Sequence, residues 1–73
     1  MVEIFKTNIQ LEQEAGLVLQ KIEKRMPNSR ITFDLEDCDH ILRVESGSQI
    51  NPNLIIEEVS ALGFQVSILP DEL

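Results

Sequence analysis

The chain has 73 residues, with six Lys and Arg against 13 Asp and Glu and a formal net charge of −7. This length predicts one domain, residues 1–73, with a modest core, since so short a chain buries only about 60% of the surface its unfolded form exposes. The acidic balance argues against nucleic acid as a partner, and no apolar run approaches the roughly 20 residues of a membrane span.

Two elements are predicted in the first part of the chain. Residues 2–9 carry β-branched and aromatic side chains without Gly or Pro, which is typical of a strand. Apolar residues then recur at steps of three and four, which predicts a helix of about four turns that ends at Pro27. The apolar face of this helix is expected to consist of Leu11, Ala15, Val18, Leu19, Ile22 and Met26.

An antiparallel hairpin should follow. Ile31, Phe33 and Leu35 alternate with polar residues, which predicts a strand with one buried face and a buried Phe33 ring. Residues 37–39 have the composition of a turn, and residues 40–45 read as the second strand.

The second helix has strong start and stop signals. Asn51 is a favourable N-cap and Pro52 suits the first helical position. Ile50 and Ile55 have the spacing of a hydrophobic staple, and Gly63 is the expected left-handed C-cap. The buried face should consist of Ile55, Val59 and Leu62. Residues 64–68 alternate as a last strand, and residues 70–73 are expected to be a loose tail.

The resulting order, strand–helix–strand–strand–helix–strand, predicts an α+β class. Right-handed crossovers and hairpin pairing give a ferredoxin-like βαββαβ sandwich, with a four-stranded antiparallel sheet and both helices on one face. Ile41 and Leu69 should point away from the helices. The side chains expected to point toward them are Leu42, Val44, Phe64, Val66 and Ile68.

Several segments together resemble a heavy-metal-associated domain of the copper-chaperone type, over nearly the whole chain. Phe5-Lys6-Thr7-Asn8-Ile9 resembles the first strand and loop of bacterial members, in which a cysteine follows at the second position after this string. Residues 33–45 resemble the central hairpin. Residues 54–59 and Leu62-Gly63-Phe64 are similar to the second helix and its glycine–aromatic exit.

The resemblance implies a Cys-x-x-Cys motif at the start of the first helix, where two thiolates bind soft metals such as Cu(I). By position these ligands fall on Leu11 and Glu14, and neither side chain suits a soft metal. We therefore expect the metal site to be lost and no cofactor to be bound. Leu11 would extend the apolar face of the helix, and Glu14 would place a negative charge at its N-terminus. Ile9 falls near the buried methionine of the family and would keep its packing role.

A relocated copper or zinc site is the alternative. Asp37-Cys38-Asp39-His40 gathers a thiol, carboxylates and an imidazole, and Cys38 and His40 could converge on one side of a strand. A closed zinc site requires four ligands, and the chain has no second cysteine or histidine. A polar turn with an incidental thiol is the favoured interpretation. A dimer that combines two such hairpins would supply more ligands.

Other activities find less support. His40 has no Ser or Cys near it in the sequence apart from Cys38, so catalysis is not expected. A small-molecule regulatory domain is also less well supported, because the chain has no glycine-rich binding loop.

The single cysteine and the absence of a signal-like segment predict a cytoplasmic location. Binding of an unidentified protein partner is therefore the remaining function. Ile41 and Leu69 could form an apolar patch for it, and the edge strands could pair between two chains in a weak homodimer.

Overall fold

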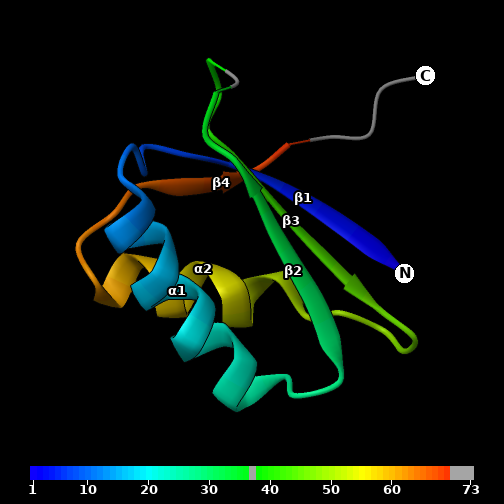
Figure 1. Ribbon diagram of the computed structural model, residues 1–73. Coiled ribbons are helices and arrows are strands. Elements are labelled where there is room, and N and C mark those ends of the chain that lie inside the picture. Colours follow the sequence, from blue (N-terminus) through cyan, green and yellow to red (C-terminus); the bar gives the residue numbers. More distant parts are fainter. Residues whose placement is uncertain (37, 70–73) are drawn as a thin grey trace.

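The computed structural model describes residues 1–36 and 38–69 and confirms the predicted order of elements. The strands are β1 (Val2–Thr7), β2 (Ser29–Asp34), β3 (Ile41–Ser46) and β4 (Val66–Ile68), and the helices are α1 (Glu12–Arg25) and α2 (Pro52–Ala61). The sheet has the order β2-β3-β1-β4 with antiparallel pairing throughout. Both helices cover one face of it (Figure 1), so the fold is ferredoxin-like. The predicted turn residue Asp37 and the tail, residues 70–73, lie outside the described residues.

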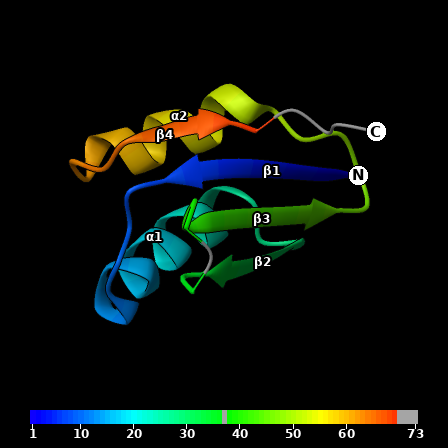
Figure 2. The same cartoon turned by 90° about the horizontal axis from the view of Figure 1, so that it is seen from above.

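The core lies between the helices and this face of the sheet. Figure 2 shows α1 on the side of β2 and β3, and α2 beside β4, in agreement with the packing contacts of the two helices. Neither helix in the described residues is long and apolar enough to cross a membrane. The buried apolar side chains are Phe5, Ile9, Ala15, Val18, Ile22, Leu42, Val44, Ile50, Ile55 and Val59.

Helix α1 matches its prediction except at its start. Leu11 is the N-cap, with an extended backbone (φ −106°, ψ 144°), and its side chain is 57% exposed. The expectation that Leu11 extends the apolar face is therefore wrong, because the chain has not yet entered the helical turn at this residue. At the other end Met26 donates its N–H to Ile22 O, and Pro27 follows.

Helix α2 begins and ends as its local sequence predicts. Asn51 accepts a 3.1 Å hydrogen bond from the backbone N–H of Asn53, and Pro52 occupies the first turn. Ile50 and Ile55, the predicted staple pair, are both buried. After the helix, Gly63 has φ 94°, the left-handed conformation that glycine adopts without steric cost.

The strand boundaries differ from the prediction by one or two residues, for identifiable reasons. β1 ends at Thr7 rather than Ile9, because the Thr7 Oγ1 accepts the Ile9 N–H (3.2 Å) and turns the chain. β3 starts after His40, whose φ of 46° is incompatible with a strand. Leu35 and Phe64 lie just outside β2 and β4.

The predicted orientation of the sheet side chains is confirmed. Ile41 neighbours the buried Leu42 and so points to the outer face, and Leu69, whose N–H donates to Ile4 O, lies on the same face. Ile68 pairs with Phe5 on the helix side but stays 44% exposed, since β4 is an edge strand of the described sheet.

Candidate functional site

Three loops gather at the end of the sheet where α1 begins. The Thr7 hydroxyl donates a 2.6 Å hydrogen bond to His40 O, which ties the first strand to the hairpin. Asn8 and Gln65 exchange two hydrogen bonds, because Asn8 Oδ1 accepts from Gln65 N (2.9 Å) and Asn8 N donates to Gln65 O (3.3 Å). These bonds fix the path of the loop that leads into the helix.

At the start of α1 stand the two residues that the family resemblance places at the metal. Glu14 Oε1 accepts the backbone N–H groups of both Gln10 and Leu11, each at 3.2 Å. The carboxylate thus satisfies the N–H group of the N-cap residue, which the helix leaves free, and the N–H group just before it, and it lies in the first turn as expected. Leu11 offers no metal-binding atom and Glu14 only hard carboxylate oxygens, so this pair does not fit a soft metal.

The residues of the predicted alternative site lie at the hairpin between β2 and β3. Cys38 is exposed, while His40 is half-buried with an Nδ1 atom that is buried and has no hydrogen-bond partner within the described residues. Asp39 lies 3.6 Å from Lys6 Nζ in an ion pair. Within residues 1–36 and 38–69, no three His, Cys, Asp or Glu side chains are grouped closely enough to hold a metal ion.

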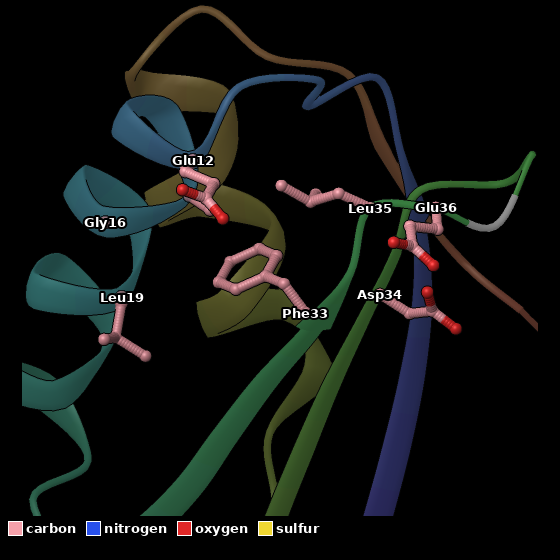
Figure 3. Close-up of a pocket in the computed structure, with 8 residues that line it drawn as sticks. Glu12, Gly16, Leu19, Phe33, Asp34, Leu35 and Glu36 are labelled. Carbon is pink, nitrogen blue, oxygen red and sulfur yellow. The ribbon is translucent and has the colours of Figure 1, made fainter.

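A groove with a volume of about 430 Å³ lies between α1 and the end of β2. Figure 3 shows Phe33 and Leu35 pointing from the strand side toward the helix, with Leu19 facing them from α1. Asp34 lies between the two apolar residues in the sequence and turns away from the helix, and Glu36 lies near it beyond the end of the strand. The lining residues are Glu12, Ala15, Gly16, Leu19, Phe33, Asp34, Leu35 and Glu36.

The groove has an apolar floor and an acidic rim. Of the eight described lining residues three are acidic and none is basic. On the helix side Gly16 leaves the groove open, since a Cβ atom built there meets no atom within 4 Å. Phe33 packs against the core and pairs with the buried Leu42, yet it is only partly buried. The predicted inner face of β2 is thus confirmed, and the expected full burial of the Phe33 ring is wrong because the groove exposes one side of it.

The sequence contained signals for this groove that were not recognised. Gly16 interrupts a helix otherwise rich in good helix formers, and such a glycine often has a packing or functional reason. The alternation from Phe33 to Glu36 continues past the end of β2, so apolar and acidic side chains separate onto two sides. Only the packing of α1 against β2 reveals that these features meet.

Comparison with protein-family models and with curated proteins found no match. The likeness to heavy-metal-associated domains therefore stays a prediction based on the sequence segments given above.

Proposed function

We propose that this chain is a non-enzymatic protein-interaction domain that resembles a heavy-metal-associated domain without its Cys-x-x-Cys metal site and acts in the cytoplasm. The observation that carries the proposal is the carboxylate of Glu14. Where the family has a thiolate, this side chain accepts two backbone N–H groups and stabilises the start of α1. A residue that serves the helix in this way has a structural role that is separate from metal transfer.

Exposed apolar surface supports an interaction role. Leu11 and Leu17 of the α1 region are 57% and 55% exposed, and the groove adds the partly buried Phe33 ring. Apolar surface rimmed by polar groups commonly marks a site of protein association, and the groove has this character. Ile41 and Leu69 on the outer sheet face offer a second, smaller apolar area.

A relocated copper or zinc site at Cys38 and His40 is the second candidate. One observation favours it: the His40 Nδ1 atom has no hydrogen-bond partner in the described residues, and buried polar atoms of this kind are uncommon. The exposed thiol would have to approach the ring for both to bind one ion. A dimer that joins two hairpins would then complete the four ligands that zinc prefers.

A metal titration separates the two candidates. The reduced protein is titrated with Cu(I) or Zn(II) against a strong competing chelator, in parallel with Cys38→Ser. The interaction domain is expected to show no stoichiometric binding. A sub-micromolar site that is lost in Cys38→Ser would instead establish the second candidate and refute the first.

A second experiment tests the interaction role directly. A photo-crosslinking amino acid is placed at Leu19, which lines the groove, or at Ile41 on the outer sheet face, and cross-linked proteins are identified from cells of the source organism. We expect one partner to be captured reproducibly from one of the two positions at native expression levels. If neither position gives a reproducible product, and light scattering shows a monomer at all concentrations, the interaction proposal fails.

A further inference from the structure

The free edge of β2 adjoins the groove. β2 stands at the end of the sheet order and pairs with β3 alone among the described strands, so one side of its backbone is open. It has six residues, against three in β4 at the other edge. An extended peptide can add to such an edge through main-chain hydrogen bonds, while pockets for alternate side chains determine which peptide is bound.

The side chains beside this edge alternate in chemistry. Phe33 and Leu35 point toward α1, whereas Asp34 turns to the other side and Glu36 lies near it beyond the end of the strand (Figure 3). A strand placed next to β2 also directs successive side chains to these two sides. Every second side chain of the added strand would enter the groove against Phe33 and Leu19, and the side chains between them would lie beside the carboxylates. The edge thus suits a strand that alternates apolar and basic residues.

The helix leaves room for the apolar set. Gly16 lines the groove, and a Cβ atom built on it meets no atom within 4 Å. A larger side chain at this position would project into the volume that the apolar residues of the peptide need. Gly16 is therefore the residue of α1 at which access to the groove can be tested without removing a core contact.

The charge distribution favours an occupant with several basic residues. The chain carries a net charge of −7, and three carboxylates of the described groove lining rim the site. An antiparallel pair of two β2 strands would place Arg30 of one copy opposite Asp34 of the other, but β2 has no second basic residue to meet Glu36. Arg30 lies at the far end of β2, away from the acidic end of the strand. The basic residues of the occupant are thus required mainly near Asp34 and Glu36.

We propose that β2 and the α1–β2 groove bind an extended segment of a partner protein in which apolar residues alternate with Lys or Arg, as a fifth strand of the sheet. This inference rests on the proposed interaction function and names its partner class. The backbone of β2 supplies hydrogen bonds, the groove receives the apolar side chains, and the carboxylates of Asp34 and Glu36 receive the basic ones.

Peptides test the assignment on the intact chain. The first probe alternates valine and lysine over the six residues of β2, with blocked termini, and its binding is followed by backbone amide NMR shifts and by fluorescence anisotropy. Saturable binding is expected, with shifts concentrated in β2 and the groove-facing side of α1. A valine–glutamate peptide should bind about tenfold or more weakly. N-methylation of alternate amides that would face β2 should weaken binding to a similar extent, because it removes the strand hydrogen bonds.

Variants supply the matched controls. Gly16→Leu fills the groove and should abolish binding, while Gly47→Leu, the same change at another open glycine outside the groove, should leave it unchanged. Circular dichroism and the melting temperature confirm that both variants fold. Asp34→Lys with Glu36→Lys should reverse the preference, so that the valine–glutamate peptide binds more tightly than the valine–lysine peptide.

Each contrary outcome has a defined meaning. Binding that Gly16→Leu or N-methylation leaves intact would be a diffuse electrostatic attraction and would overturn the proposal. A dimer detected by sedimentation, with NMR shifts in β2, would show that a second copy is the occupant and would also overturn it. If the peptide fails to bind but the cross-linker at Ile41 captures a partner, the groove assignment falls while the interaction function stands. If both fail, both are refuted.

Discussion

Two glycine substitutions should change the stability of this domain in opposite directions. Gly16 is the fifth residue of the 14-residue helix α1, and a methyl group at its Cα meets no atom within 4 Å. Glycine inside a helix costs about 0.8–1.0 kcal/mol relative to alanine, chiefly because its unfolded state has more conformational freedom. Gly16→Ala is therefore expected to raise the free energy of unfolding by about 0.8–1.0 kcal/mol, since no steric cost offsets the gain.

Gly63 is the matched control, because the same methyl group there also meets no atom within 4 Å. The difference lies in the backbone: Gly63 has φ 94°, where a Cβ atom is strained against the following carbonyl. Gly63→Ala should lower the free energy of unfolding by about 1–2 kcal/mol. With packing equal at the two positions, the sign of the change depends on the backbone conformation alone.

Urea denaturation followed by far-ultraviolet circular dichroism measures both effects. The midpoint should rise in Gly16→Ala and fall in Gly63→Ala, with the slope of free energy against urea unchanged. For a domain of this size, each kcal/mol corresponds to a shift of about 4–8 °C in the melting temperature. A Gly16→Ala variant that is less stable than the parent would refute the assignment of this glycine to an open face of a regular helix. Equal signs for the two variants would refute the backbone argument.

Four further substitutions test other contacts by the same denaturation assay. Asn51→Ala removes the N-cap of α2 and should cost about 1 kcal/mol, and an unchanged stability would disprove the capping role. Thr7→Val keeps the shape of a buried side chain but removes its two hydrogen bonds, so a loss of about 1–3 kcal/mol is expected; a neutral result would contradict the role given to this hydroxyl. Phe5→Ala, at a ring with 0% exposure, should cost about 3–5 kcal/mol, and Phe33→Ala only about 1–3 kcal/mol. Equal losses for the two phenylalanines would mean that the groove is closed in solution.

Local signals in the sequence were sufficient for much of the fold. The N-cap Asn51 and the exit glycine Gly63 predicted both ends of α2, because a helix terminus is determined by bonds within a few residues. The alternation of apolar residues also predicted which side of each strand faces the helices. Alternation is a property of the extended backbone and does not depend on the neighbouring elements.

Features that depend on distant contacts were predicted less well. β1 ends early because the Thr7 hydroxyl bonds Ile9 N and reaches His40 O, a residue 33 positions away. Periodicity likewise assigned Leu11 to the apolar face, although the helix starts only at the next residue. The partial exposure of Phe33 follows from the space left between α1 and β2. Spacing along one strand cannot show whether the facing helix fills that space.

The unequal lengths of the two edge strands have a further consequence for the behaviour of concentrated protein. The open edge of the six-residue strand β2 is a template on which identical chains can stack into cross-β fibrils. The three-residue strand β4 offers fewer backbone groups for such pairing. Strand β2 carries two charged residues, Arg30 and Asp34, and in-register stacking of identical chains would bring each beside an equal charge. Charged residues on an edge strand are expected to oppose such stacking.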